Sequence, residues 1–158
     1  MAIATTVGDA LAFEGVDFRV LRRPASGVAA DTLTAYGVEP EACAQASLLK
    51  DAYGFVLTVT SAAHRLDVEF LRRELHRELE PAGDDDLDEI FCDCEVGSVP
   101  PCGPWYRVPT IVDARLRACA SVVFDGGEPR SLVRVTGDDF AKLLRDAEYL
   151  EFDHAGSA

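Results

Sequence analysis

The pattern of apolar and polar positions along the chain predicts a series of short helices and strands. Residues 5–14 place their apolar side chains on one side of a helix, and residues 17–21 alternate as a short strand does. Asp31 is a candidate cap for a helix that runs to Tyr36 and ends at Gly37. The start of the chain is therefore expected to contain two helices with one strand between them.

The middle of the chain carries the clearest pattern. Two apolar runs, Ser47–Lys50 and Phe55–Thr60, flank the segment Asp51–Gly54, in which Gly54 is available for a left-handed turn position. After Asp67, leucine and valine recur at spacings of three and four as far as Leu79, which is typical of an amphipathic helix. We therefore expect a hairpin and a helix here, and a shorter helix after Asp86.

The last third alternates between strand and turn patterns. Strands are expected over Val108–Val112, Ser121–Phe124 and Leu132–Val135, and a helix capped by Thr136 is expected over Asp139 to about Arg145. About six strands and four or five helices without regular βαβ alternation predict an α+β fold around a mixed, mostly antiparallel sheet. Residues 1–158 are interpreted as one domain, with a core over about 5–145 and a tail over 146–158.

Length and composition agree with one globular domain. A chain of 158 residues, 48% hydrophobic, can bury an ordinary hydrophobic core without stabilising disulfide bonds or metal ions. Because no run of 18 apolar residues occurs, no membrane span is expected. The first fifteen residues lack the basic region of an export signal, and five cysteines, an odd number, fit reduced thiols. These features predict a cytoplasmic protein.

The net charge of −13 limits the partners that we expect. General DNA binding depends on basic side chains that release counterions, so DNA is not expected as a partner. Recognition of one nucleic-acid end remains open, because that requires only a local basic patch. The acidic run GDDDLDE over 83–89 is interpreted as the solvated start of a helix.

Residues 97–103, GSVPPCG, form an unusually stiff loop. Pro100 and Pro101 fix their φ angles and remove two backbone donors, whereas Gly97 and Gly103 allow positive φ or the close approach of another molecule. One interpretation is a rigid connection between two elements. The other is a cradle that holds a ligand against backbone N–H groups.

Three stretches together are similar to a known family. AQASLLKDAYGFVLTVTSAAHRLD over 44–67, EVGSVPPCGPWYRVPTIVD over 95–113 and FDGG over 124–127 resemble the YbaK-like aminoacyl-tRNA editing family, which includes trans-editing deacylases and the editing domain inserted in prolyl-tRNA synthetases. The similarity runs from about residue 5 to about residue 145. It implies a compact α+β domain whose pocket receives the aminoacylated end of a mischarged tRNA and hydrolyses the ester, with water as nucleophile and no cofactor.

The resemblance also implies roles for particular residues. Fixed N–H donors would stabilise the oxyanion, and the two prolines would hold the loop still around the carbonyl. Two aspartates and a histidine either contact the substrate or serve as turn residues, and the residues alone do not decide this. The implied catalytic residues are Gly97, Ser98, Gly103 and Gln45, and the implied substrate-binding residues are Pro100, Pro101, Asp113, Asp125, Gly126, Gly127 and His64.

One position departs from the family pattern. The family has a lysine before the first hairpin strand that holds the phosphate or carbonyl end of the substrate, and Gln45 occupies this position here. Lys50 lies five positions later, and an odd separation along a strand points a side chain to the opposite face. Two accounts remain: hydrolysis that is reduced or shifted to another ester, or a pocket that binds without catalysis.

Cysteines and aromatic residues beside the loop suggest other chemistry. Cys92, Cys94 and Cys102 provide three thiols, but a structural zinc site needs four ligands, so we expect reduced thiols and no metal. Catalysis by Cys102 would need a base, and none is evident in the sequence. Trp105 and Tyr106 either stack on the terminal adenine or pack in the core.

Overall fold

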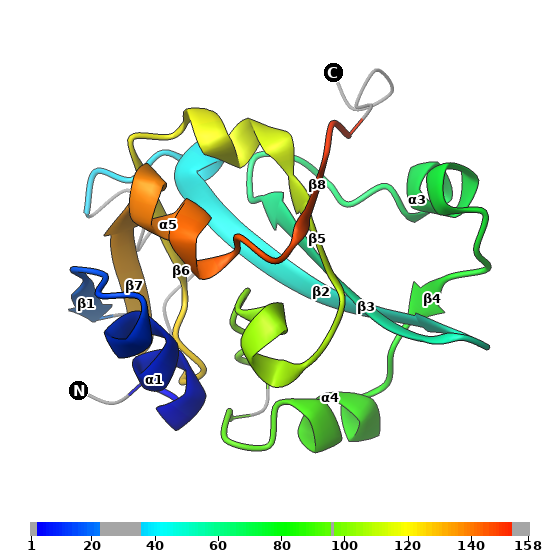
Figure 1. The fold of residues 1–158 in the computed structure, drawn as a ribbon, viewed down its shortest axis with the longest axis horizontal. Coiled ribbons are helices and arrows are strands. Elements are labelled where there is room, and N and C mark those ends of the chain that lie inside the picture. Colours follow the sequence, from blue (N-terminus) through cyan, green and yellow to red (C-terminus); the bar gives the residue numbers. More distant parts are fainter. Residues whose placement is uncertain (1–2, 23–35, 96, 153–158) are drawn as a thin grey trace.

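The computed structural model describes residues 3–22, 36–95 and 97–152. Within these residues the chain forms one mixed, eight-stranded sheet in the order β1-β7-β6-β2-β3-β5-β8, with β4 also paired to β2 (Figure 1). The strands are β1 (Arg19–Arg22), β2 (Cys43–Asp51), β3 (Gly54–Ser61), β4 (Glu80–Pro81), β5 (Thr110–Asp113), β6 (Ser121–Asp125), β7 (Ser131–Thr136) and β8 (Glu148–Leu150). The expected α+β fold in a single compact domain is confirmed.

Short helices surround this sheet. In Figure 1, α1 and α5 lie near β6 and β7, α4 lies below the central hairpin, and α3 lies beyond β5. The described helices are α1 (Thr5–Phe13), α3 (Val68–Leu75), α4 (Asp84–Ile90) and α5 (Gly137–Leu143), with 3₁₀ turns η1 (Pro40–Ala42), η2 (Gly103–Tyr106) and η3 (Ala114–Ala118). The helix expected at Asp31 lies, apart from Tyr36, outside the described residues.

The central hairpin forms where the sequence predicts it. Strands β2 and β3 pair antiparallel from Ala44 opposite Ser61 to Asp51 opposite Gly54. The Asp51 carboxylate accepts hydrogen bonds from the amides of Tyr53 and Gly54 at 2.8 and 3.1 Å, and Gly54 has φ 138°. Asp51 and Gly54 therefore supply the turn chemistry that the pattern indicated.

Alternation along β2 divides its side chains between two faces of the sheet. Ala44 and Leu48 point into the largest apolar cluster, which contains α1 and α5. Leu49 points the other way and packs with Phe70 and Leu71 of α3. Gln45 shares the side of Leu49, and we call this side the Gln45 face.

A third apolar cluster lies near the other end of the sheet. It contains Leu21 of β1, Val123 of β6 and Leu132 of β7, with Val38 packed on them. Val123 is the Cα partner of Cys43, which is two residues before Gln45, so this cluster also lies on the Gln45 face. The exposed side chain of Gln45 therefore lies between two separate apolar clusters.

Helix α3 is shorter than expected. It begins after Asp67, whose carboxylate accepts from the Phe70 amide at 3.0 Å, but it ends at Leu75 instead of continuing to Leu79. His76 adopts a left-handed conformation with φ 53°, and Arg77 then forms an ion pair with Asp51 of the hairpin turn. The next residues turn back to form β4 against β2, so tertiary pairing ends the helix before its apolar pattern does.

The end of the chain also differs from expectation. Helix α5 has the predicted cap, since the Thr136 hydroxyl accepts from the Asp139 amide at 3.1 Å, but the helix spans Gly137–Leu143 and so begins and ends two residues earlier than expected. The segment expected as a tail contributes β8, which pairs parallel with β5. Phe152 then packs against Phe70, with ring centroids 5.6 Å apart. No helix in the described residues is long and apolar enough to cross a membrane.

Candidate functional site

The sheet is split along one edge of β2. Residues 43–44 pair with β6, residues 49–50 pair with β4, and both ladders lie on the side of β2 that β3 does not occupy. The Leu48 carbonyl also accepts from the Ala82 amide, directly after β4, at 2.9 Å, so residues 45–47 face a gap between the two ladders. Gln45, the position where the family pattern has lysine, is exposed at this gap, and its Cα partner on β3 is Thr60.

A polar row crosses the Gln45 face beside this split. The register of the β2–β6 ladder, extended by one residue, puts Asp125 next to Gln45. The register of the β3–β5 ladder, extended in the same way, puts Asp113 next to Thr60. Three of the expected site residues, from distant parts of the sequence, thus lie in one row, and Thr60 is a member that the sequence analysis missed.

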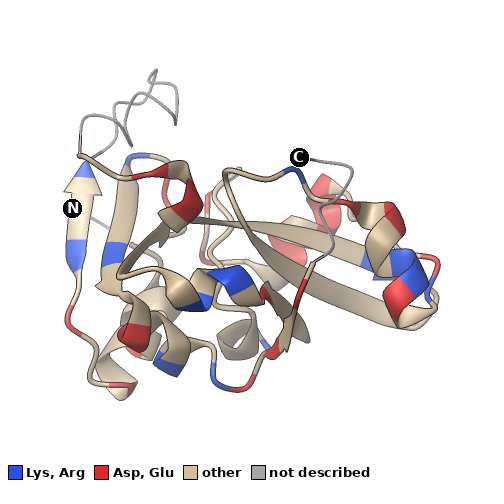
Figure 2. Ribbon diagram, turned by 90° about the horizontal axis from the view of Figure 1, so that it is seen from above, with Lys and Arg blue, Asp and Glu red and all other residues tan. Residues whose placement is uncertain are grey.

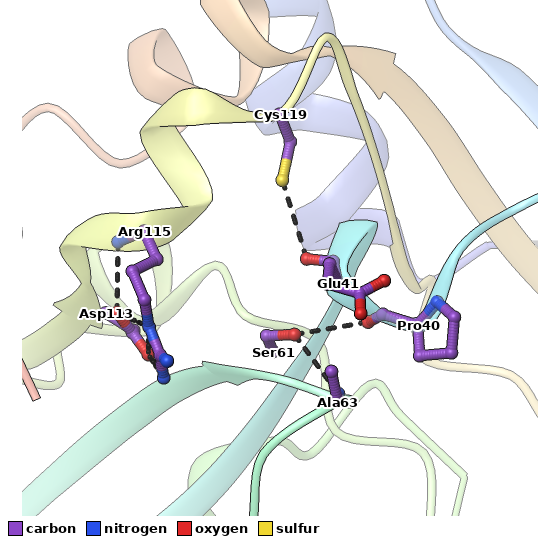
Figure 3. A network of polar contacts seen from close by, with 7 residues as sticks. All are labelled: Pro40, Glu41, Ser61, Ala63, Asp113, Arg115 and Cys119. Carbon is purple, nitrogen blue, oxygen red and sulfur yellow. Dashed lines mark hydrogen bonds and ion pairs between the residues drawn. The ribbon is translucent and has the colours of Figure 1, made fainter. Parts of the chain in front are cut away.

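Asp113 is already engaged within the protein. Its side chain is fully buried, and its carboxylate accepts from the Arg115 backbone amide at 3.0 Å and from the Arg115 guanidinium at 2.7 Å (Figure 3). These contacts cap η3 and neutralise the charge. Of the two interpretations left open by the sequence, the geometry favours the structural one for Asp113.

The first part of the GSVPPCG loop opens on a cavity. Gly97 is exposed with φ 84°, and together with Ser98 and Val99 it lines a cavity of about 100 Å³. The facing wall comes from α4, through Asp84 and Asp88. This arrangement fits the cradle interpretation, because the backbone at Gly97 is both bent and accessible.

Ser98 differs from the expectation of a free amide donor. Its backbone amide donates to the Glu95 carbonyl at 3.0 Å, so in this conformation it is not available to a substrate oxygen. Ser98 as a whole is 2% exposed. Ser98 therefore closes the turn that shapes Gly97, and Gly97 is the better candidate for contact with a ligand.

The second part of the loop is packed into the protein. Pro100, Pro101 and Gly103 are buried, and a Cβ atom on Gly103 would lie 1.8 Å from Oγ1 of Thr110. Glycine is needed at position 103 because η2 packs so closely on β5. The rigid-connection interpretation therefore fits this half of the loop. The packing gives no support to the catalytic role that the resemblance implies for Gly103.

The Asp125-Gly126-Gly127 turn holds the start of the loop. The Gly127 carbonyl accepts from the Glu95 amide at 2.9 Å, and the Gly126 carbonyl accepts from the Ala4 amide at 2.8 Å. The Asp125 carboxylate accepts from the Gly127 amide at 3.0 Å. Sequence reasoning grouped this turn with the loop, and the structure joins them, although these contacts stabilise the protein itself.

His64 lies in a different cavity. Residues 63–69, from the loop after β3 into the first turn of α3, line a cavity of about 580 Å³, and the His64 amide donates to the Ser61 carbonyl at 3.1 Å. Within the described residues, no lining residue is shared with the cavity at Gly97. The structure therefore does not bring His64 together with Gly97.

The thiols near the loop are poor nucleophiles. Burial raises the pKa of Cys94, which lines the Gly97 cavity, to about 12, and burial likewise raises the pKa of Cys102 to about 12. Both thiols are therefore protonated at neutral pH, whereas nucleophilic attack requires the thiolate. The described part of the chain contains no group of three or more histidine, cysteine or acidic residues that could hold a metal ion.

The two aromatic residues after the loop are mainly packed. Tyr106 donates its hydroxyl hydrogen to Asp93 at 2.7 Å, and Trp105 meets Phe13 edge-on at 5.4 Å between ring centroids.

Asp84 and Asp88 are cavity residues that sequence reasoning assigned to a solvated helix start. Their i, i+4 spacing was the available signal, because it puts both on one side of a helix.

The comparisons with known proteins agree with this geometry. The family model for the aminoacyl-tRNA editing domain matches residues 23–143. A crystal structure described as that of a candidate trans-editing enzyme for prolyl-tRNA synthetase is similar with a TM-score of 0.80 and 25% identity, covering 96% of this chain and 99% of that one. The search of curated proteins finds no match.

The likeness to a second solved structure shows the fold alone. This structure is described as a candidate signal transduction protein from Marinobacter aquaeolei VT8, with a TM-score of 0.78 and 19% identity over 99% of this chain and 32% of that one.

The family match spans most of the chain and includes the split sheet edge, the GSVPPCG loop and the glycine turn. The chain therefore belongs to the aminoacyl-tRNA editing domain family.

Proposed function

We propose that the protein hydrolyses the ester of a mischarged tRNA, acting in trans on the free aminoacyl-tRNA. The observation that carries the proposal is Gly97, an exposed, positive-φ residue that lines a cavity. A backbone donor fixed at this point would meet the negative charge that develops on the ester carbonyl oxygen. Losing one such donor costs about 3 kcal/mol of transition-state stabilisation.

Water is the nucleophile in this proposal. The buried thiols of Cys94 and Cys102 have raised pKa values, and Asp113 is neutralised by Arg115. These side chains therefore offer neither a thiolate nor a free base at the site. The protein's contribution is to position the ester and to hold its donors still, as a preorganised polar site does.

Gln45 sets the expected level of activity. Its amide can donate and accept hydrogen bonds but carries no charge, and a charge-assisted hydrogen bond is roughly twice as strong as a neutral one. The side chain is exposed at the gap in the sheet, so it can reach a ligand there. We expect hydrolysis that is slow, or that is directed to another aminoacyl ester.

A second candidate function is binding without catalysis. The neutral Gln45 favours it, because the same pocket would then retain an aminoacyl end without stabilising the transition state. The two functions separate in one assay. A deacylase releases the amino acid catalytically, whereas a binding module shifts the aminoacyl-tRNA on a gel and leaves the ester intact.

The test is a panel of mischarged tRNAs, each labelled on the amino acid and incubated with the wild type and with Gln45→Lys. We expect Gln45→Lys to raise the deacylation rate by about ten-fold, which corresponds to about 1.4 kcal/mol. The restored ammonium group would strengthen the contact at the split edge. Rates are measured as released amino acid per enzyme under multiple-turnover conditions.

Ser47→Lys is the matched control, because it adds the same charge two residues along β2 on the same face. An equal gain with Ser47→Lys would reduce the effect to general electrostatic attraction of tRNA. If neither the wild type nor Gln45→Lys releases any amino acid across the panel, the proposed hydrolysis is wrong.

A further inference from the structure

Two arginines lie directly opposite each other on neighbouring strands. Arg19 of β1 and Arg134 of β7 are Cα partners in an antiparallel ladder, and such partners have Cβ atoms about 5 Å apart on the same face. Figure 2, in which Lys and Arg are blue, shows basic positions on neighbouring strands at the left of the molecule. Leu21 and Leu132, two residues along each strand, belong to the cluster on the Gln45 face, so the arginines share that face.

This pair has no acidic partner in the described part of the chain. Neither Arg19 nor Arg134 forms an ion pair there, although like charges directly opposite destabilise a sheet. Six other basic residues in the described part of the chain do have an acidic partner. The described ion pairs are Lys50–Asp86, Arg72–Glu69, Arg77–Asp51, Arg115–Asp113, Lys142–Asp139 and Arg145–Glu14. In a protein of net charge −13, an unneutralised arginine pair needs an explanation.

The pair lies close to the split edge of the sheet. Strand β7 is separated from β2 by β6 alone, and Val123 of β6 is the Cα partner of both Arg134 and Cys43. Gln45 is two residues beyond Cys43 on the same face. At about 4.8 Å between strands and about 3.3 Å per residue, Arg134 and Gln45 are separated by roughly 12 Å of sheet surface.

We propose that Arg19 and Arg134 together bind phosphate groups of the RNA strand whose 3′ end lies at Gln45. The inference rests on the proposed function for the identity of that RNA. Guanidinium groups match phosphate oxygens in a bidentate geometry, and a bound phosphate would offset the repulsion within the pair. The distance to Gln45 suits an unpaired end whose preceding phosphates run across β6 and β7.

Two further arginines lie at the other end of the β1–β7 ribbon, where Arg22, three residues from Arg19, points to the opposite face of the sheet. Arg22 of β1 and Arg130, directly before β7, are both exposed. Neither forms an ion pair with the described residues. The Arg19–Arg134 pair therefore provides the basic side chains of the β1–β7 ladder on the Gln45 face, and an RNA backbone is a ligand with repeated negative charges.

The experiment measures binding of a fluorescent acceptor-stem RNA hairpin that carries no amino acid. Binding is followed by fluorescence anisotropy at several chloride concentrations. The variants are Arg19→Gln with Arg134→Gln, and the matched pair Arg73→Gln with Arg107→Gln, which removes two exposed arginines elsewhere. We expect the first double variant to bind more weakly and to lower the slope of log affinity against log salt by about 1.4, the value for two contacts to single-stranded phosphates. The matched pair should change neither quantity.

Two further measurements keep structural effects apart from phosphate binding. Arg19→Lys with Arg134→Lys retains the charges and should keep most of the salt slope. Inorganic phosphate should raise the melting temperature of the wild type more than that of Arg19→Gln with Arg134→Gln. This variant is expected to fold because it loses no ion pair.

The proposal is overturned if Arg19→Gln with Arg134→Gln binds the hairpin with wild-type affinity and salt slope. It is equally overturned if Arg73→Gln with Arg107→Gln loses as much affinity and slope as that variant. It is also overturned if an acidic peptide displaces the RNA at equal charge concentration, because a protein partner would then fit the surface equally well. These outcomes are independent of the deacylation assay. RNA binding through the arginines without amino-acid release would refute hydrolysis and leave this surface assigned.

Discussion

At the scale of single residues, Gly103 shows how little room the loop leaves. A Cβ atom here would lie 1.8 Å from Oγ1 of Thr110 and 3.0 Å from Cδ2 of Leu57. We therefore expect Gly103→Ala to lower the free energy of unfolding by at least about 1–3 kcal/mol, because overpacking forces neighbouring groups to move. Urea denaturation followed by circular dichroism would measure the loss.

Gly8→Ala is the matched control for that substitution. Gly8 lies within α1, and its added Cβ would approach only Cδ1 of Ile3, at an ordinary 3.8 Å. Alanine in a helix interior is more favourable than glycine by about 0.5–1 kcal/mol. A Gly103→Ala variant as stable as the wild type would contradict the packing described for η2 and β5.

Residue chemistry also explains which site predictions could be made from sequence. The pairing of glycines and prolines indicated a stiff loop, and Gly97 does turn with positive φ at a cavity. The engagement of Asp113 by Arg115 was not predictable, because an aspartate at a strand end looks the same whether it caps a turn or faces a ligand. The amide of Ser98 is occupied for a similar local reason.

At the scale of elements, the hairpin and α3 are linked by one ion pair. Asp51 in the hairpin turn accepts two hydrogen bonds of 2.6 Å from the guanidinium of Arg77, directly after α3. The Arg77 hydrogen bonds, with the Tyr53 and Gly54 amides, lower the pKa of Asp51 to about 2 from its ordinary 3.8. Because the folded-state pKa is depressed, the stabilisation is complete above about pH 4 and is lost as the pH falls toward 2.

We expect this linkage to appear as an acid-sensitive melting temperature. Between pH 5 and pH 2 the wild type should lose more stability than Asp51→Asn, which has no carboxylate to protonate at this position. Asp139→Asn, which removes the partly buried carboxylate that pairs with Lys142 on α5, serves for comparison. Parallel melting curves for the wild type and Asp51→Asn over that range would contradict the assigned role of the ion pair.

Element boundaries show where sequence patterns stop being sufficient. The β2–β3 hairpin was predicted because its alternation and its turn residues agree locally. Strands β4 and β8 were missed, since segments of two and three residues carry no alternation and form only against β2 and β5. The polar row through Gln45 was equally invisible, because it depends on the registers of ladders between distant segments.

At the scale of the whole molecule, the net charge of −13 acts on stability. Surplus negative charge repels itself in the compact state, and salt screens that repulsion. Raising sodium chloride from about 10 to about 150 mM shortens the screening length from about 30 to about 8 Å. We expect the melting temperature to rise by about 2–4 °C, equivalent to about 1 kcal/mol for a chain of this length.

Calorimetry in chloride would check this prediction, because phosphate and sulfate would also occupy the arginine pair. A melting temperature that falls with added chloride would mean that ion pairs such as Arg77–Asp51 outweigh the general repulsion. The same charge makes a local basic surface the expected route for any RNA contact, which is why the arginines on β1 and β7 stand out in this chain.

The strand order of the sheet has a consequence for the kinetics of folding. Pairs β2–β3 and β6–β7 join neighbours along the chain, whereas β1 must find β7 across more than a hundred residues, from Arg19 to Arg134. Closing such a long loop costs entropy before any contact repays it. The two hairpins should consequently form early, and the arginine surface should assemble only in the last phase of folding.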